Sequence, residues 1–324
     1  MTKKLSVIVT AHNRKEYIPY AINSILSASN TETVEDIEII VVKNFEDDKL
    51  DSWLEQNNIK NIITNEESLA LKQAIGINNA SGDLIAFLED DDMFALNKVQ
   101  VLRSLSYHQN LDFFHNSFIS IREYITSSRI VPFNESNIEF FHADNLQDKR
   151  ILKYIIKKYH PELYNSCIAI SKDLATKCLD GLKRVDINTE RFWLLCAIEK
   201  GRQLALTNAP LTLYRVHSQS FSQPNSAFFN AKLLERYVRS YLFMLQYFQK
   251  EIVRQVIKEQ YVLHLAHYFI ITKYNTAKKL RLTMSLFANS LRPSAIYNEY
   301  SLLSAIALLS SLASVSLAKR ILYR

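Results

Sequence analysis

The first hundred residues alternate short apolar runs with segments of helical periodicity. The apolar runs are residues 5–10, 37–42, 61–64 and 83–88. The helical segments are residues 14–28, 48–57 and 69–80. Strands that are apolar on both faces and joined by helices are typical of a parallel sheet covered on both sides. The pattern predicts a βαβαβαβ layer of the nucleotide-binding type, in which ligands bind at the carboxyl ends of the strands.

The pattern changes twice further along the chain. Residues 111–216 mix strands and helices, which extends the sheet with an α+β second half. Residues 226–297 are predicted amphipathic helices whose Tyr and Phe stripes favour helix packing over ligand binding. Residues 301–318 are apolar but contain six serines and are shorter than the roughly 20 residues that cross a bilayer. We therefore predict a domain at residues 1–225 and a helical basic appendage at residues 226–324.

Glycine and cysteine usage excludes several kinds of site. The chain has four glycines in 324 residues, and neither a GxGxxG nor a GxxxxGK[ST] motif can be written with them. The phosphates of a bound nucleotide must then be held by side chains or by a metal on carboxylates. The three cysteines lack metal-ligand spacing, so a disulfide framework or zinc site is not expected and a reducing compartment is favoured.

Charge is distributed unevenly between the two predicted parts. Residues 1–227 carry 25 Lys and Arg against 29 Asp and Glu, whereas residues 228–324 carry 14 against 4. Basic helices with apolar residues favour an anionic membrane surface, and no nucleic-acid reader motif accompanies them. The apolar run at residues 5–9 is too short for a signal peptide. We expect a cytoplasmic protein, peripheral at the cytoplasmic face of the membrane, that binds no nucleic acid.

Four consecutive carboxylates follow the strand at residues 83–88. They are Glu89, Asp90, Asp91 and Asp92. Like charges this close raise one another's pKa values unless a cation joins them. Oxygen ligands at a strand end suit Mg²⁺ or Mn²⁺, which bind one or two carboxylates together with phosphate oxygens. A solvated acidic loop or first helical turn is the alternative.

Two segments resemble the family 2 inverting glycosyltransferases. SVIVTAHNRKEYI at residues 6–18 is similar to the opening strand of that family, and SGDLIAFLEDDDMFALNKV at residues 81–99 is similar to the strand that leads into its DxD motif. The resemblance implies an α/β, GT-A-like (Rossmann-like) fold with a mostly parallel sheet and helices on both faces, followed here by a C-terminal helical region. It also implies a divalent metal, Mn²⁺ or Mg²⁺. The implied reaction transfers a sugar from a nucleoside-diphosphate sugar to a hydroxyl acceptor, with inversion at the anomeric carbon.

The resemblance assigns residues position by position. The implied nucleotide-sugar pocket contains Thr10, His12, Asn13, Arg14, Glu16, Lys72, Glu89, Asp90 and Asp92. Asp91 takes the second, metal-binding position of the DxD motif. The second strand ends in Asn44 where the family has an acidic pair, so a base contact through the Asn44 amide leaves a UDP-sugar and a GDP-sugar both open. Residues 72–76 correspond to the family's Ala-Arg-Asn-x-Gly motif, and of that motif only the glycine, Gly76, is present here.

Two later segments resemble the family's base helix and its Tyr-Arg-x-His segment. In DINTERFWLLCAIEKG, at residues 186–201, Glu190 is expected to accept the proton of the acceptor hydroxyl, with Asp186 as the second choice. Helix capping by Glu190 is the alternative. In LTLYRVHSQSFS, at residues 211–222, the resemblance places His217 at the metal or diphosphate and Arg215 in support of the anionic site. A lone His on a strand is often structural instead.

Two other classes of protein are alternatives to this interpretation. A sugar nucleotidyltransferase normally has a glycine-rich loop after its first strand, and residues 11–18 contain no glycine. A non-catalytic, membrane-associated module of the same fold is compatible with the altered second and third segments. The expected partners are therefore a UDP- or GDP-sugar and a sugar acceptor, such as a lipid-linked sugar, a glycan or a surface polysaccharide, together with an anionic membrane surface.

Overall fold

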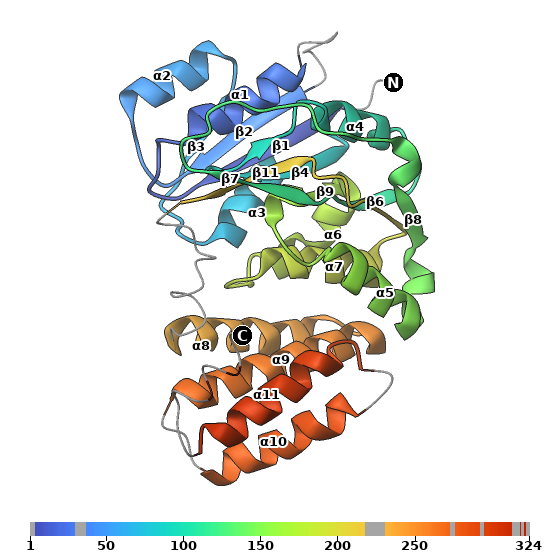
Figure 1. Cartoon of the computed structure of the whole chain (residues 1–324). Coiled ribbons are helices and arrows are strands. Elements are labelled where there is room, and N and C mark those ends of the chain that lie inside the picture. Colours follow the sequence, from blue (N-terminus) through green and yellow to red (C-terminus); the bar gives the residue numbers. More distant parts are fainter. Residues whose placement is uncertain are drawn as a thin grey trace. The chain divides into compact units, whose positions relative to one another are not determined.

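The computed structural model of the chain forms two compact units (Figure 1). The structure describes residues 4–29, 37–217, 231–272, 276–291, 295–312, 318 and 321. The first, here the sheet unit, comprises Met1–Leu146, Tyr154–Val185 and Thr189–His217. The second, here the helical unit, comprises Gln147–Lys153, Asp186–Asn188 and Ser218–Arg324. The domain boundary predicted at residues 225 and 226 lies outside the described residues.

The sheet unit is built on one eight-stranded sheet. Its strands are β1 (Leu5–Ala11), β2 (Ile37–Lys43), β3 (Lys60–Ile63), β4 (Leu84–Glu89), β6 (Leu111–His115), β8 (Glu139–His142), β9 (Ile168–Ser171) and β10 (Gln203–Leu206). Their order is β3-β2-β1-β4-β9-β6-β10-β8. The pairs β1–β2, β1–β4, β2–β3 and β6–β10 are parallel, whereas β9 and β8 pair antiparallel with their neighbours. The predicted mostly parallel sheet is confirmed.

Helices cover both faces of this sheet, as predicted (Figure 1). The α-helices of this part of the chain are α1 (Ile18–Ser29), α2 (Asp48–Gln56), α3 (Leu69–Asn79), α4 (Lys98–Ser106), α5 (Lys149–Tyr159), α6 (Lys172–Leu182) and α7 (Thr189–Lys200). The 3₁₀ helices are η2 (Glu135–Asn137), η3 (Ala143–Gln147) and η4 (Asn165–Cys167). Helices α1 and α4 pack together on one face, and α3, α6 and α7 cover the other. Side-chain caps from Asp47, Ser68 and Ser171 begin α2, α3 and α6.

Burial on both faces explains why the first strands are continuously apolar. Every residue of β1 is buried, because helices pack against it from either side. Gly76 in α3 permits a close approach to this strand, since a Cβ there would lie 2.5 Å from Ile8 Cγ2. Helix α3 therefore lies directly against the central strand, close to the end where β1 leaves the sheet.

A small three-stranded sheet lies next to the acidic run. It consists of β5 (Met93–Phe94), β11 (Thr212–Val216) and β7 (Phe118–Arg122), in the order β5-β11-β7. The apolar run at residues 112–121 therefore forms two strands, β6 and β7, that belong to different sheets. The backbone N–H of Asn116 donates to Cys167 and that of Ser117 donates to Ala209, so these two residues leave both ladders.

The helical unit contains four described α-helices. They are α8 (Ala231–Tyr247), α9 (Glu251–Ile271), α10 (Thr276–Ser290) and α11 (Asn298–Ser310). The buried carboxylate of Glu259 in α9 accepts hydrogen bonds from the backbone N–H groups of Ile296 and Tyr297, both at 2.9 Å, and so fixes the start of α11. Throughout the described ranges, each helix is too short or too polar to span a bilayer. The predicted C-terminal helical region is confirmed.

Candidate active site

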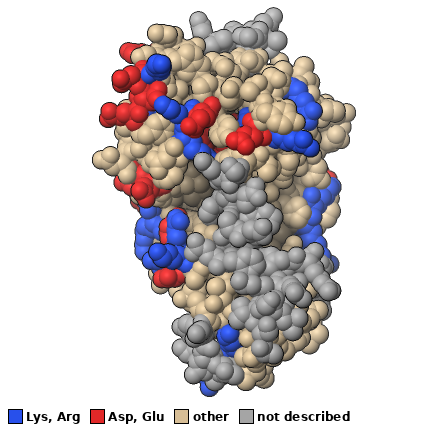
Figure 2. Space-filling model, turned by 60° about the vertical axis from the view of Figure 1, so that its left-hand side comes forward, with Lys and Arg blue, Asp and Glu red and all other residues tan. Residues whose placement is uncertain are grey.

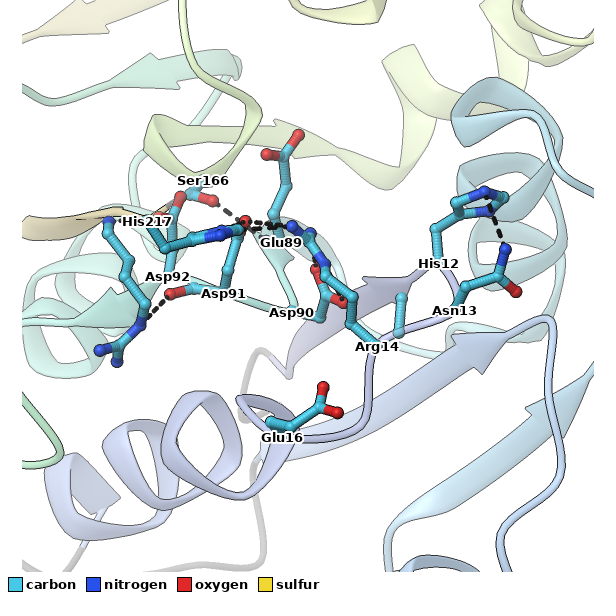
Figure 3. Close-up of polar contacts among 12 residues, drawn as sticks. His12, Asn13, Arg14, Glu16, Glu89, Asp90, Asp91, Asp92, Ser166 and His217 are labelled. Atoms are coloured by element: carbon cyan, nitrogen blue, oxygen red, sulfur yellow. Dashed lines mark hydrogen bonds and ion pairs between the residues drawn. The ribbon is translucent and has the colours of Figure 1, made fainter. Parts of the chain in front are cut away.

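The carboxyl ends of β1, β2 and β4 lie side by side at one edge of the sheet. In the parallel register, Thr10 of β1 pairs with Val42 of β2 and with Glu89 of β4. The segments that follow these strands therefore leave the sheet together, which is the position expected for a ligand site in an open α/β sheet. Figure 3 shows side chains from this edge, namely those of His12, Asn13, Arg14, Glu16 and residues 89–92.

Arg14 and His217 converge on the acidic run (Figure 3). The Arg14 guanidinium pairs with both oxygens of Asp90, with Nε 3.2 Å from Oδ2, and its Nη1 lies 2.9 Å from Asp91 Oδ2. His217 Nε2 lies 3.0 Å from the same Asp91 oxygen. His217 follows β11 and is buried. Residues that the resemblance assigned to separate segments are thus brought together around one carboxylate.

Three carboxylates of the run could hold a metal ion. One ligand oxygen from each of Glu89, Asp91 and Asp92 lies within 4.8 Å of the others. Burial, with repulsion from the neighbouring carboxylates, raises the pKa of Asp92 to about 8 and that of Glu89 well above its ordinary value. Among the described residues, Glu89 and Asp92 form no ion pair, unlike Asp91. The unbalanced negative charge and the hard oxygen donors fit a divalent cation.

Asp90 and Asp91, unlike Glu89 and Asp92, are balanced by neighbouring charged groups. Burial and the charge of Asp91 raise the pKa of Asp90 to about 6, although the Arg14 guanidinium opposes this. Burial would also raise the pKa of Asp91, but the hydrogen bond with His217 and the charge of Arg14 outweigh it and lower that pKa. Asp91 is therefore the carboxylate of the run that is most readily ionised.

Arg215 supports the acidic run from within the protein. Its side chain is 1% exposed, and Nε donates to the Asp91 carbonyl at 2.8 Å. Its Nη1 donates to the carbonyls of Glu123 and Ile125 at 2.7 and 2.6 Å. Its backbone N–H donates to Asp92 Oδ1 at 3.0 Å. The guanidinium thus fixes backbone carbonyls around the acidic run.

Lys72 and His12 meet beneath the end of β1. Lys72 Nζ donates to the Ala11 carbonyl at 2.8 Å and lies 3.1 Å from His12 Nδ1. The Lys72 side chain is 1% exposed, and burial lowers its pKa to about 8. Burial and the charge of Lys72 lower the pKa of His12. A neutral His12 can accept from Lys72 and so keeps a fixed ring orientation at the strand end.

Asn13 and Asn44 form a reciprocal pair across the ends of β1 and β2. The Asn13 backbone N–H donates to Asn44 Oδ1, and Asn44 Nδ2 donates to Asn13 Oδ1, both at 2.9 Å. Asn13 has φ 54°, a left-handed conformation that Asn adopts more readily than most residues. One N–H and one lone pair remain on the Asn44 amide for a ligand. Glu16 is exposed and accepts from the Lys15 backbone N–H at 3.1 Å.

Asn165 links the acidic run to Glu190. Its Nδ2 donates to Glu190 Oε2 at 3.1 Å and to Glu89 Oε1 at 3.3 Å. Its Oδ1 accepts from Gln73 at 3.0 Å and from Thr189 at 2.9 Å, so the amide orientation is fixed from both ends. Burial raises the pKa of Glu190. Sequence reasoning missed Asn165, because no motif or periodicity marks it.

Asp186 forms an ion pair away from the acidic run. Its carboxylate pairs with Arg236 of α8, with Oδ1 2.8 Å from Nη2 and 3.0 Å from Nε. Asp186 and Arg236 both belong to the helical unit, whereas Glu190 belongs to the sheet unit. Of the two base candidates, Glu190 is the one whose hydrogen bonds reach the acidic run.

Lys98 is the lysine that follows the acidic run in the segment resembling the family's DxD strand. Its Nζ donates to the Ser166 carbonyl at 2.6 Å and to Thr212 Oγ1 at 3.0 Å, and lies 4.1 Å from the centroid of the Phe94 ring. Burial lowers its pKa to about 8. Ser166 in turn accepts from the Glu89 backbone N–H at 3.0 Å. Lys98 and Ser166 therefore fix η4 against the end of β4.

Comparison with known sequences places this site in a family. Residues 6–164 match Glycosyl transferase family 2. An uncharacterized glycosyltransferase of Rickettsia conorii is 30% identical over 124 residues, which cover 37% of this chain and 20% of that protein. An uncharacterized glycosyltransferase of Haemophilus influenzae is 27% identical over 115 residues, which cover 35% of this chain and 38% of that protein. The matched segment thus spans well under half the length of these relatives.

Comparison with solved structures confirms the GT-A-like fold. Staphylococcus aureus TarS 1-349, in its complex with UDP-GlcNAc, superposes with a TM-score of 0.58 and 13% sequence identity, over 98% of this chain and 90% of that chain. At this identity the similarity concerns the fold alone. The two sequence segments, the geometry of the strand ends and the family match agree: residues 6–164 form a domain of glycosyl transferase family 2.

Proposed function

We propose that this protein transfers a sugar from a nucleoside-diphosphate sugar to an acceptor hydroxyl, with inversion at the anomeric carbon. The observation that carries the proposal is the hydrogen-bonded link from the acidic run through Asn165 to Glu190. It connects the carboxylates that would hold a metal and diphosphate with Glu190, the carboxylate that would deprotonate an acceptor hydroxyl. The complex of TarS with UDP-GlcNAc supports a nucleotide-sugar ligand for this fold.

The acidic run would hold Mn²⁺ or Mg²⁺ through Glu89, Asp91 and Asp92. Such a cation supplies positive charge to a diphosphate leaving group, for which no proton donor is required. Arg14 and His217 keep the Asp91 carboxylate oriented and ionised. Residues at the ends of β1 and β2 would then contact the nucleotide. Among them, the Asn44 amide would use its remaining N–H and its remaining lone pair.

Glu190 would act as the base that accepts the proton of the acceptor hydroxyl. The Asn165 amide orients one of its oxygens, and burial raises the pKa of the carboxyl, which favours proton transfer near neutral pH. A hydroxyl activated by Glu190 attacks the anomeric carbon opposite the leaving diphosphate. This direct displacement gives inversion.

Calorimetric titration with UDP and then GDP tests the donor site. Each nucleotide is titrated with Mn²⁺ and again with EDTA. We expect one nucleotide to bind with Mn²⁺, and at least about tenfold more weakly with EDTA, because the carboxylates alone repel a diphosphate. Binding of neither nucleotide at millimolar concentration would instead favour a non-catalytic member of the family.

We further propose that the acceptor is a lipid-linked sugar, a glycan or a surface polysaccharide at the cytoplasmic face of the membrane, where the helical unit binds an anionic surface. On the face drawn in Figure 2, acidic side chains gather on the sheet unit. The C-terminal region is basic, with 14 Lys and Arg against 4 Asp and Glu in residues 228–324. Several large apolar side chains of α10 and α11 are exposed, namely Leu280, Met284, Tyr300, Leu302, Leu303, Ile306 and Leu309. Basic charge with exposed apolar side chains is typical of helices that bind at a membrane surface.

Vesicle sedimentation of the full chain tests this surface. We expect it to sediment with phosphatidylglycerol vesicles and much less with phosphatidylcholine vesicles, because anionic lipids attract basic residues. Met284→Asp should reduce sedimentation by placing a negative charge among the apolar side chains. Ile130→Asp, in the sheet unit, is the control, because both side chains are 73% exposed. Equal sedimentation of the two variants, or none with either lipid, would contradict the proposal.

A further inference from the structure

Three aromatic rings from distant parts of the chain meet beside the acidic run. They are Phe118 of β7, Tyr214 of β11 and Tyr164, which directly precedes η4, and we call them the aromatic platform. The ring centroids are 4.3 Å apart for Phe118 and Tyr164, 4.9 Å for Tyr164 and Tyr214, and 5.4 Å for Phe118 and Tyr214. Each of the three residues is partly exposed. A cluster that served only as core would be closed to solvent.

The platform stands on an open face of the small sheet. Phe118 pairs in parallel register with Thr212, two residues before Tyr214, so Phe118 and Tyr214 project from the same face. Ser120 and Val216 share this face and are exposed, Val216 by 42%. The alternate residues of the same strands face the other way and are largely buried. The open face therefore combines aromatic rings with neighbouring polar groups.

Tyr164 ties the platform to the proposed base. Its backbone has φ 59° and ψ 100°, a strained conformation for a bulky residue. The next residue, Asn165, donates to both Glu190 and Glu89. The turn that brings the Tyr164 ring onto the platform is thus the turn that places the Asn165 amide between the two carboxylates. The surrounding structure holds both in fixed relation.

We propose that the aromatic platform is the acceptor subsite and that it stacks against a pyranose ring. Aromatic faces pack against the C–H face of a sugar, while polar groups at the edge bind its hydroxyls. The platform belongs to β7, β11 and the start of η4, whereas the expected nucleotide contacts follow β1 and β2. A sugar stacked here would lie next to Asn165, whose amide donates to Glu190. The inference rests on the proposed transferase function, and it makes a sugar, rather than a bare lipid or protein hydroxyl, the group that receives the transfer.

Saturation-transfer NMR on the full chain tests the subsite. The probes are the methyl β-pyranosides of glucose, galactose and N-acetylglucosamine, each with UDP or GDP and Mg²⁺. We expect saturation of the ring protons of at least one probe by the wild-type protein. Phe118→Leu and Tyr214→Leu should each raise its Kd by about tenfold, since they keep apolar volume but remove an aromatic face. Phe118→Tyr should retain binding.

The control is Phe140→Leu, which removes an aromatic side chain of β8 that is 39% exposed. It should bind the probe as the wild type does, and all variants should bind the nucleotide unchanged. Absence of saturation for every probe, or equal Kd values for the platform variants and the control, would overturn the proposal. Whether the donor site binds a nucleotide is measured separately, by the calorimetric titration. A negative result there would not change how pyranoside binding is read.

Discussion

Asp91→Asn is expected to lower sugar transfer by about 10³-fold, the size of losing several kcal/mol of charge stabilisation in the transition state. Asparagine can still bond to His217, but it provides no negative charge for a cation. The free energy of unfolding should change little. The substitution weakens a pair with Arg14, yet it also removes a charge that raises the pKa values of Glu89 and Asp92. Initial rates of nucleoside-diphosphate release and urea denaturation measure the two effects.

Asp180→Asn is the matched control for this substitution. Asp180 lies in α6, its side chain is 98% exposed, and it pairs with Lys183 at 3.5 Å. The same chemical change there should leave both the rate and the metal-dependent binding of nucleotide as in the wild type. If the Asp91→Asn variant transferred sugar at the wild-type rate, Asp91 would not be a metal ligand. A different set of ligands would then have to hold the cation.

The first half of the fold could be predicted because its physical cause is local. Strands β1, β2 and β4 are buried by helices on both faces, so their sequences are continuous apolar runs. Their parallel direction brings their carboxyl ends to one edge. The convergence of Arg14 with Asp90 follows from that arrangement and needed no knowledge of the rest of the chain.

The second half could not be predicted in the same way, because its determinants are tertiary. Residues 112–121 contain neither Gly nor Pro, yet the chain passes from one sheet to another at Asn116 and Ser117, where backbone hydrogen bonds go to distant segments. Asn165 bridges Glu89 and Glu190 only because η4 packs against the end of β4. Such a bridge leaves no pattern in the sequence.

The sequence resemblance includes Lys98 after the acidic run, but the burial of this lysine could not be predicted. Lys98 begins α4 and its sequence position resembles that of an ordinary helical lysine. It is buried instead, with its ammonium group bonded to Ser166 and Thr212. The buried ammonium group also interacts electrostatically with Asp92, although the two form no ion pair. Arg215 acts similarly, through the backbone carbonyls that surround the run.

Glu190→Gln is expected to retain nucleotide binding and to lower the rate of transfer by about 10²- to 10⁴-fold, the usual contribution of a positioned base. Glutamine has the same shape, and its carbonyl oxygen can still accept from Asn165, so the link to Glu89 should persist. Its amide cannot accept the proton of the acceptor hydroxyl. The turnover number for transfer and the Kd for the nucleotide separate these two expectations.

The control is Glu199→Gln, which makes the same change near the other end of α7 and should leave transfer unaltered. Full transfer by the Glu190 variant would require another base, and Asp186 is the next carboxylate to test. Asp186 pairs with Arg236, so its carboxylate is already committed to that partner. If Asp186→Asn abolished transfer while Glu190→Gln did not, Asp186 would be the base. The hydrogen bonds of Asn165 would then serve to hold the acidic run in place.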